Sequence, residues 1–381
     1  MGEVLVSARG QVDNLGDSVL RRGLLRALRS AGDLTINVVG MPPGYLTGLG
    51  LSDADVLVSD PARWGPTLTR GLLGGALYGY NAGETYATAG YARHCFTTAP
   101  LLLAGRLRGG RSVHTGFGIR APHRFWGRAI RLGLAGCDEL TWRDASSRDW
   151  IGAGGLAPDW AYGEGSSNAD LERGGATSAA GAGREGAGAG AGRDVLAVSL
   201  RFDRPLPDET WLGAVRELAR SRGLTVVALP QVGRDNDRAV VLARELGGEV
   251  LAWHGNDHAA REDVVRGVLR RSSFVVSDRL HALVLGHTEG ALPVGLGTAS
   301  VDKIARTLAT VGVHDVTGVQ TGLTVGQAVE LVDGIDSRRS ELLALVRPAR
   351  ARLAELADRI AALGTARQSP HDREVRLGTG P

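Results

Sequence analysis

Apolar and polar positions along this chain alternate between two periodicities. Short apolar runs, typical of buried strands, precede longer segments in which apolar residues recur every three or four positions. In the first half this pattern predicts strands at residues 4–7, 34–39, 55–59, 112–116 and 139–142, with helices near 19–28, 94–107 and 125–135. Strands that alternate with helices in this way are typical of parallel βαβ units.

The alternation stops after residue 163 and resumes at Asp194. The Gly-, Ala- and Ser-rich stretch 174–192 has no apolar periodicity and predicts a flexible linker. Beyond it the pattern predicts strands at 195–200, 224–229, 249–253, 274–276 and 293–297, and helices at 209–221, 238–246, 261–270, 279–287 and 301–308. A last helical pattern covers residues 338–363.

These elements predict an α/β protein with two Rossmann-like domains. The chain has 381 residues, which suits two ordinary domains. We place an N-terminal α/β domain at 1–165, a linker at 166–193, a C-terminal α/β domain at 194–335, a C-terminal helix at 336–365 and a flexible tail at 366–381. Two such domains favour a ligand cleft between them, at the carboxyl ends of the strands.

Composition narrows the class of protein. Hydrophobic residues make up 43% and charged residues 22%, as in soluble globular proteins. The net charge is +3, acidic residues are interspersed, and no basic run carries interleaved aromatics, so nucleic acid is not the expected partner. Only one of the 44 basic residues is a lysine, which indicates the codon bias of a GC-rich genome.

The sequence also predicts a cytoplasmic location. Cys95 and Cys137 are the only cysteines, and two isolated thiols favour a reducing compartment. The N-terminus enters a strand pattern without a basic segment and a long apolar one, so no signal peptide is expected. No apolar run reaches the ~20 residues that span a bilayer.

Polar residues follow several of the predicted strands where these strands end. They are Asn14, Gly16 and Asp17 after the first strand, Arg143 after 139–142, Arg201 after 195–200, Gln231 after 224–229, and Ser277, Asp278, Arg279 and His281 after 274–276. The carboxyl ends of parallel strands meet at one edge of a sheet, where such folds bind ligands. We therefore expect these residues to lie near one cleft.

The stretch from Ser277 to Ala282 opens a helix directly after a strand. The N–H groups and dipole of a helix N-terminus attract anions, an arginine adds a bidentate fork, and a histidine moves protons near neutral pH. Another interpretation needs no ligand: Ser277 or Asp278 caps the helix, Arg279 is a surface charge and His281 is packed. The motif alone leaves both interpretations open.

The ordered set of these motifs resembles the polysaccharide pyruvyl transferase family. The resemblance runs through Asn14-Leu15-Gly16-Asp17, Arg143-Asp144, Ala157-Pro158-Asp159, Val198-Ser199-Leu200-Arg201, Leu229-Pro230-Gln231, Ser277-Asp278-Arg279-Leu280-His281-Ala282, Pro293 and Lys303. Lys303, the single lysine, stands where the family pattern places one. The Gly-rich segment that family members carry near residue 59 is displaced here to 71–75, in the half expected to bind the acceptor.

The resemblance implies a GT-B-like fold and a reaction in which phosphoenolpyruvate places a pyruvate ketal on a sugar of a cell-surface glycan or glycolipid precursor. It implies no cofactor and no metal. If the acceptor is linked to a lipid, the protein would contact the membrane peripherally to reach it. His281 is the expected general acid and Asp17 the tentative base. The implied donor-binding residues are Arg201, Arg279, Leu280, Ser277, Lys303 and Gln231, and the implied acceptor-binding residues are Asn14, Gly16 and Arg143.

Two other functions stay open at this stage. The first is a GT-B-type glycosyltransferase that uses a nucleotide sugar, since residues 287–293 resemble the donor end of such enzymes, where Glu289 would hold a ribose. The second is a non-catalytic relative that binds a glycan. Most of the seven tryptophans are expected to be packing residues. Trp64 and Trp253 are candidates for sugar platforms, although aromatic side chains also line ordinary interdomain seams.

Overall fold

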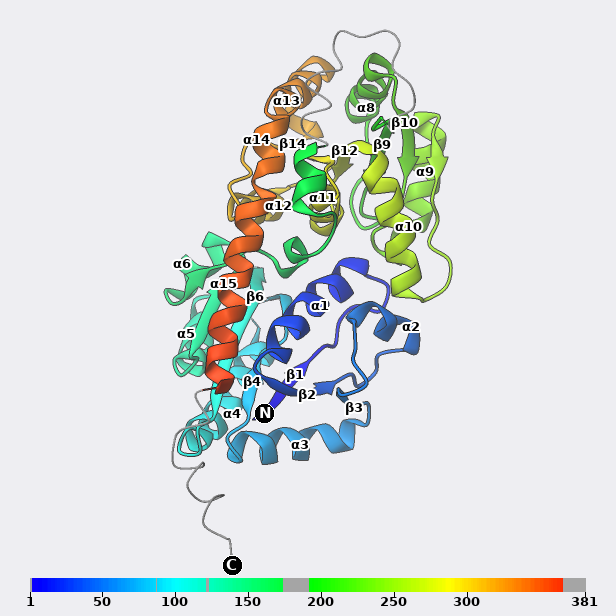
Figure 1. Ribbon diagram of the computed structural model, residues 1–381. Coiled ribbons are helices and arrows are strands. Elements are labelled where there is room, and N and C mark those ends of the chain that lie inside the picture. Colours follow the sequence, from blue (N-terminus) through cyan, green and yellow to red (C-terminus); the bar gives the residue numbers. More distant parts are fainter. Residues whose placement is uncertain (1, 87, 121–122, 174–191, 366–381) are drawn as a thin grey trace, which may run out of the picture.

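The computed structural model describes the chain except for residues 1, 87, 121–122, 174–191 and 366–381. The predicted tail and most of the predicted linker therefore lie outside the described residues. The described chain forms two α/β domains, one above the other in Figure 1. Each domain is built on a parallel sheet, which confirms the predicted pair of Rossmann-like domains.

The N-terminal sheet has eight strands in the order β3-β2-β1-β4-β6-β7-β8, and β5 pairs with the second half of β6. The strands are β1 (Gly2–Ser7), β2 (Gly32–Asn37), β3 (Val56–Val58), β4 (Leu77–Gly79), β5 (Gly83–Tyr86), β6 (Arg111–Arg120), β7 (Glu139–Trp142) and β8 (Gly155–Leu156). Val4 and Val6 pack in one core and Leu5 in another, so β1 is buried on both faces.

The helices of this domain connect the strands and cover the sheet. They are α1 (Leu15–Arg29), α2 (Pro43–Leu46), η1 (Thr47–Leu49), α3 (Pro61–Leu73), α4 (Ala89–Arg106), α5 (Arg124–Leu134), α6 (Ala145–Ile151) and η2 (Trp160–Gly163). The predicted helices near 19–28, 94–107 and 125–135 are confirmed as α1, α4 and α5.

The C-terminal sheet has six strands in the order β11-β10-β9-β12-β13-β14. Its strands are β9 (Val195–Ser199), β10 (Thr225–Ala228), β11 (Glu249–Val250), β12 (Ser272–Ser277), β13 (Leu292–Gly297) and β14 (Thr317–Val319). The helices are α8 (Glu209–Arg222), η4 (Gly233–Asp235), α9 (Asn236–Leu246), α10 (His258–Arg271), α11 (Leu280–Thr288), α12 (Asp302–Ala309), η5 (Gln320–Gly322) and α13 (Val325–Ser337). This is the doubly wound strand order of a Rossmann domain, with its crevice at the carboxyl ends of the strands.

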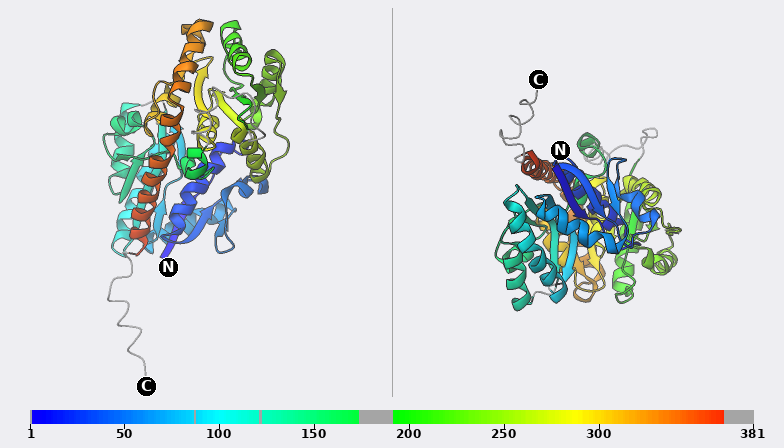
Figure 2. Two further views of the ribbon diagram at one scale, coloured as in Figure 1. Left: turned by 45° about the horizontal axis from the view of Figure 1, so that its top comes forward. Right: turned by 90° about the horizontal axis from the view of Figure 1, so that it is seen from below.

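The chain ends by crossing back to the first domain. The single helix predicted at 338–363 is two helices, α14 (Arg339–Ala344) and α15 (Val346–Thr365). Pro348 lacks the N–H that would bond to the carbonyl of Ala344, so the hydrogen-bond ladder is interrupted there. α15 packs on α1 and η2, and Figures 1 and 2 show it lying along the N-terminal domain.

Some elements were not predicted from the sequence. α3, β4, β5 and α13 fall in stretches with weak periodicity, and the strand predicted at 249–253 covers only Glu249–Val250. Inside the segment 166–193, residues 168–173 are helical and Leu171 is buried. None of the described helices is long and apolar enough to cross a membrane.

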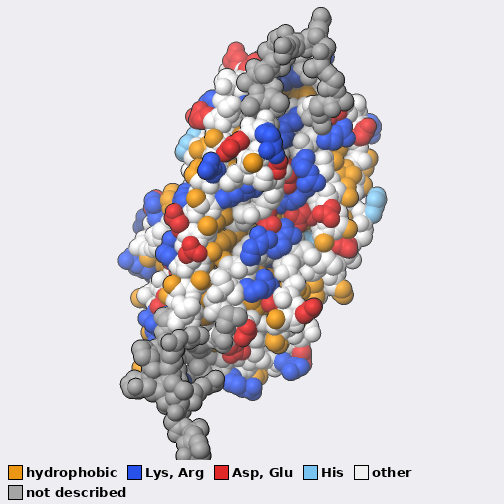
Figure 3. Space-filling model, viewed as in Figure 1, with side chains coloured by type: hydrophobic (Ala, Val, Ile, Leu, Met, Phe, Trp, Pro, Cys, Tyr) orange, Lys and Arg blue, Asp and Glu red, His pale blue; other side chains and the backbone are white. Residues whose placement is uncertain are grey.

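Ion pairs join the two domains along their seam. Arg22 of α1 binds Glu262 of α10, with Nη2 2.6 Å from Oε1, and also lies 3.4 Å from Glu164. In Figure 3 basic and acidic side chains lie together across the middle of the face shown. One hydrophobic core runs continuously from Val4 in β1 to Ile360 in α15 and includes the C-terminal sheet. The domains are therefore held in one arrangement.

Candidate functional site

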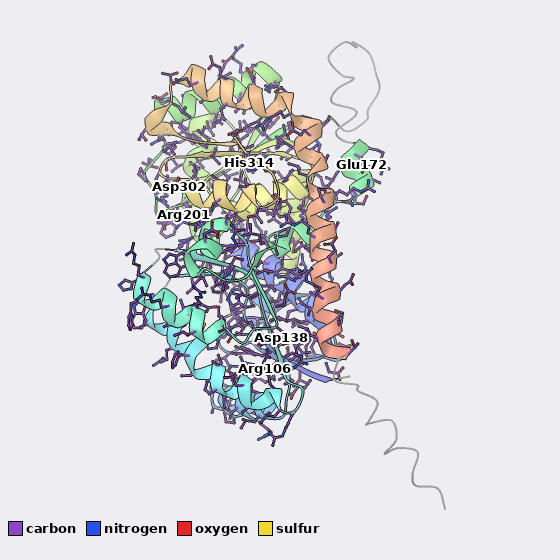
Figure 4. The ribbon with its side chains drawn as sticks, turned by 90° about the vertical axis from the view of Figure 1, so that its left-hand side faces the viewer. Arg106, Asp138, Glu172, Arg201, Asp302 and His314 are labelled. Carbon is purple, nitrogen blue, oxygen red and sulfur yellow. The ribbon has the colours of Figure 1, made fainter. Side chains whose placement is uncertain are left out.

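A cleft of about 870 Å³ lies between the two domains, at the carboxyl ends of both sheets. Nine of the eleven candidate residues line it: Asn14, Asp17, Arg143, Arg201, Gln231, Arg279, Leu280, His281 and Lys303. Gly16 and Ser277 are buried behind its wall. Arg201, labelled in Figure 4, lies where the C-terminal domain faces the N-terminal one. The structure thus gathers residues from strand ends 289 positions apart in sequence, from Asn14 to Lys303.

His281 connects the two halves of the cleft. It lies in the first turn of α11, and its Nε2 is 3.4 Å from Oδ2 of Asp159 in the N-terminal domain. The same oxygen of Asp159 accepts a hydrogen bond from Nη1 of Arg143 at 3.0 Å. Burial opposes ionisation of Asp159, but His281 and Arg143 outweigh it and hold its pKa well below the usual range. The buried carboxylate of Asp159 therefore holds Arg143 by a hydrogen bond and lies within ion-pair distance of His281.

The ring of His281 packs against the backbone of α1 at Gly16. A Cβ built on Gly16 would lie 2.2 Å from Nδ1 of His281, far inside van der Waals contact. Glycine at this position is what lets α11 approach α1 closely enough for His281 to reach Asp159. Gly16 thus acts on the site through His281, since its own backbone does not line the cleft.

Substituting Gly16→Ala should therefore displace His281 and lower the free energy of unfolding by about 1–3 kcal/mol, the usual cost of overpacking. Gly267→Ala is the matched control, since a Cβ there meets nothing within 4 Å and the residue is helical, in α10. The control should be neutral or more stable, because alanine favours a helix. Urea unfolding of both variants measures the difference; an unchanged midpoint for Gly16→Ala would contradict the contact.

Two arginines face the cleft beside the N-terminus of α11. Nε and Nη2 of Arg279 bind Asp235 at 2.7 and 2.6 Å, and Nε and Nη2 of Arg201 bind Asp203 at 2.9 and 2.6 Å. The bidentate forks expected to hold a phosphate are therefore occupied by carboxylates. These bonds fix both guanidinium groups and leave the Nη1 group of each for a ligand.

The N-terminus of α11 adds backbone donors to this side of the cleft. Arg279 is the N-cap residue, and no described side chain caps the helix, so the interpretation of Ser277 or Asp278 as a cap is wrong. Ser277 instead donates from Oγ to the carbonyl of Ser199 at 2.5 Å and accepts from the N–H of Arg279 at 2.8 Å. Asp278 Oδ1 accepts from the N–H of Arg201 at 2.8 Å. Both residues set the positions of the two arginines.

The loop after β1 meets the loop after β10. Oδ1 of Asn14 accepts from Nε2 of Gln231 at 2.6 Å, and the N–H of Leu15 donates to the carbonyl of Gln231 at 3.2 Å. Asp17 accepts from the N–H of Gln11 at 2.8 Å and lies 3.3 Å from Nη1 of Arg21. Asn14 and Gln231, assigned to opposite substrates, thus bind each other, while the role of Asp17 as a base stays a prediction.

Glu84 forms a second charged group on the cleft, which the sequence did not point to. Its carboxylate lies 2.8 Å from Nζ of Lys303 and 3.4 Å from Nη2 of Arg143, and it also pairs with Arg120. Burial opposes ionisation of Glu84, but Lys303, Arg143 and Arg120 outweigh it and lower its pKa to about 2. Burial beside Arg143 lowers the pKa of Lys303 to about 7, despite the opposing effect of Glu84.

A signal for Glu84 exists in the sequence. It is the only acidic residue between Asp60 and Asp138. A lone carboxylate among many arginines is a candidate for a buried ion pair, although β5, which carries it, was itself not predicted.

The N-terminal half of the cleft is aromatic. Its wall is formed by Trp64, Tyr78, Tyr80, Tyr91, His94 and Phe117. Tyr91 stacks on Phe117 with ring centroids 5.0 Å apart and donates or accepts a hydrogen bond with His114 at 2.6 Å. Rings with polar tips suit a ligand that is partly apolar and partly hydroxylated. Trp253 is buried and does not line the cleft.

Comparison with known proteins identifies the fold. No family model matches the chain, and no curated protein matches its sequence. Among solved structures, UDP-GlcNAc 2-epimerase from Neisseria meningitidis bound to UDP-GlcNAc is similar, with a TM-score of 0.55, 9% identity, and coverage of 95% of this chain and 100% of that one. Anabaena Alr3699/HepE in complex with UDP gives a TM-score of 0.53 at 11% identity, covering 96% and 100%. The chain has the GT-B fold.

In this GT-B fold the residue proposed to hold a nucleotide ribose does not reach the cleft. The side chain of Glu289 is fully buried, binds Nη1 of Arg266 at 2.6 Å and lies 3.8 Å from Arg270. It does not line the cleft. Glu289 therefore links the end of α11 to α10 through these arginines. It is not placed to contact a ribose in the cleft, as the sequence had suggested.

Proposed function

We propose that this GT-B-fold chain is a transferase that moves a pyruvyl group from phosphoenolpyruvate to a saccharide. The observation that carries the proposal is the convergence of Arg201, Arg279, the open N-terminus of α11, His281 and Lys303 on one cleft. Phosphoenolpyruvate carries a phosphate and a carboxylate, and cations with helix N–H groups suit both. The ordered sequence motifs support the same donor.

The reaction balances with two hydroxyls of one sugar. One hydroxyl oxygen bonds to the central carbon of phosphoenolpyruvate while the methylene carbon takes a proton and becomes a methyl group. The second hydroxyl oxygen then bonds to the same carbon, and the bond between this carbon and the phosphate oxygen breaks. The proton of the second hydroxyl leaves with the phosphate. In this proposal His281 supplies the proton to carbon, Asp17 accepts one from a hydroxyl, and the aromatic wall holds the sugar.

A nucleotide-sugar enzyme is the second candidate. The similar solved structures carry UDP or UDP-GlcNAc in their descriptions, which favours this candidate at the level of the fold. A cleft of about 870 Å³ also has room for a nucleotide sugar. Fold alone does not decide between donors, because one fold hosts many reactions.

Ligand binding separates the candidates. We expect phosphoenolpyruvate to raise the melting temperature of the protein and UDP to leave it unchanged, with phosphate released once a suitable saccharide is added. Arg279→Lys should weaken phosphoenolpyruvate binding about 10- to 100-fold, the usual value of charge-assisted hydrogen bonds. Arg244→Lys, an exposed position on α9, is the control and should bind normally.

Protection by UDP without any by phosphoenolpyruvate would refute pyruvyl transfer and support the second candidate. Binding of a saccharide with neither donor would instead identify a non-catalytic glycan-binding protein.

A further inference from the structure

Helices α4 and α5 pack side by side on the outer edge of the N-terminal domain and expose large apolar side chains. Phe96, Leu103 and Leu107, in or directly after α4, are 59, 59 and 89% exposed, and Phe125 and Leu132 of α5 are 64 and 67% exposed. The helices touch closely, since Gly133 of α5 lies against Cys95 of α4. Single exposed apolar residues need no explanation, but five on two adjacent helices mark a candidate contact surface.

The same surface carries positive charge. Residues 85–137 contain eight arginines and neither aspartate nor glutamate, and of these Arg106 and Arg111 pair with Asp138 and Arg120 with Glu84. Arg124, Arg128 and Arg131 are exposed on α5 at helical spacing, beside Phe125 and Leu132, and no described carboxylate pairs with these three arginines. We call the exposed side chains of α4 and α5 together the basic apolar face.

The basic apolar face adjoins the mouth of the cleft. Tyr91 and His94, in the first two turns of α4, line the cleft, as does Arg120 at the end of β6, shortly before α5. Phe125 packs edge-on against Trp126 at this end, with ring centroids 4.7 Å apart. Figure 4 shows the opposite ends of the helices, marked by Arg106 and Asp138, farther from the labelled Arg201. A surface bound by this face would therefore lie next to the aromatic half of the cleft.

We propose that the basic apolar face docks the protein on a bilayer surface that carries anionic headgroups. Aromatic and aliphatic side chains beside arginines are the combination that enters the boundary between headgroups and acyl chains, while the arginines pair with phosphates. A second copy of this chain does not complement the face, because two such surfaces would bring like charges together. Nucleic acid would pair with the arginines but leave Phe96, Phe125 and Leu132 in water.

On a docked protein, the mouth of the cleft would lie close to the bilayer, because it adjoins the basic apolar face. An acceptor sugar on a lipid carrier could then reach the aromatic wall of the cleft directly from the bilayer. That the acceptor is lipid-linked rests on the proposed function. The bilayer contact itself does not, so its test uses no activity.

Vesicle flotation tests the proposal. The full chain is mixed with vesicles of phosphatidylcholine alone, or of phosphatidylcholine with phosphatidylglycerol, at low and at high salt. Wild type should float with the anionic vesicles at low salt and less at high salt, and should not float with phosphatidylcholine alone. Phe125→Ser/Arg128→Glu should reduce partitioning roughly tenfold or more, because it removes one apolar anchor and reverses one charge.

The matched control is Val240→Ser/Arg244→Glu, the same pair of changes at exposed positions on α9 of the other domain. It should float like wild type. Failure of wild type to bind anionic vesicles at low salt would overturn the proposal. So would unchanged binding of Phe125→Ser/Arg128→Glu, or a wild-type dimer in sedimentation velocity that the same variant dissociates, since the face would then belong to a second copy.

Discussion

Substituting Asp159→Asn should lower the free energy of unfolding by up to roughly 3–5 kcal/mol, because it removes the nearer of the two carboxylates that neutralise the buried Arg143 and leaves Glu84, at 3.4 Å, as the other. The side chain of Arg143 is 2% exposed and that of Asp159 0%. Asparagine can still accept the hydrogen bond that Oδ1 receives from the N–H of Ala161 at 3.0 Å. Its amide group, however, would point N–H donors at Arg143, from which Oδ2 of the carboxylate now accepts a hydrogen bond.

The same substitution should slow the proposed phosphate release by roughly 10²–10⁴-fold, the contribution of a positioned proton-transfer group. His281 would lose the carboxylate that fixes its ring, so kcat should fall more than KM rises. If Asp159→Asn destabilises the protein as expected but leaves kcat unchanged, His281 does not transfer the proton. The structural and catalytic parts of the prediction are thus separable.

The pH dependence of unfolding gives an independent readout of Asp159. Its pKa is depressed in the folded state, so its charge stabilises wild type above the unfolded value of ~3.9 and loses this effect as the pH falls. Asp159→Asn should lack this contribution to the free energy of unfolding, so its stability should fall less than that of wild type as the pH is lowered. Asp149→Asn is the matched control: Asp149 is 63% exposed and pairs with Arg148, also at the surface, so its loss should cost at most about 1 kcal/mol.

Much of the fold could be predicted because its strands are buried on both faces. β9 is buried at every position, and such a continuous apolar run is visible in sequence. β4 and β5 were missed because they are three and four residues long and contain Gly79 and Gly83, so no run forms. α3 was missed because Gly65, Pro66 and Gly71 interrupt its pattern.

Most of the candidate residues could be found because they follow a strand, and the carboxyl ends of parallel strands meet at one cleft; Lys303, in α12, was found only through the family resemblance. Their counter-ions could not be found in this way. Asp235 lies 44 positions before Arg279, and Glu84 lies 219 positions before Lys303. Pairing over such distances depends on how two domains close on each other, which periodicity and turn chemistry do not encode. This is why Arg279 looked free for a phosphate in the sequence and is held by Asp235 in the structure, whereas Arg201 binds Asp203, only two positions away.

Lys303 should make binding of the anionic donor depend on pH near neutrality. Burial beside Arg143 lowers its pKa to about 7, so the ammonium group is largely lost above that pH in the free protein. Affinity for phosphoenolpyruvate should therefore fall as the pH rises through about 7, by at most tenfold per pH unit for one proton. Titration calorimetry between pH 6 and 9 measures this, at about one-unit steps.

Two variants should change the pH dependence of phosphoenolpyruvate binding in different ways. Lys303→Arg keeps the positive charge throughout, so its affinity should not show the decline. Glu84→Gln removes the carboxylate that raises the pKa of Lys303, so the decline should begin at lower pH than in wild type. The titration of the ligand itself is common to all three proteins and cancels in the comparison. A decline that persists in Lys303→Arg would assign it to another group.

Unfolding tests the same lysine without any ligand. The folded pKa of Lys303 lies below the unfolded value of ~10.4, so the unfolded chain binds more protons between these two values. Stability of wild type should therefore rise with pH from about 7 towards 10, relative to Lys303→Arg, whose charge cannot be lost. If this rise is present but affinity for phosphoenolpyruvate does not change with pH, Lys303 loses its proton beside Arg143 and the donor binds elsewhere. If the rise is absent, Lys303 remains charged and solvated, and its pairing with Glu84 is only a surface contact.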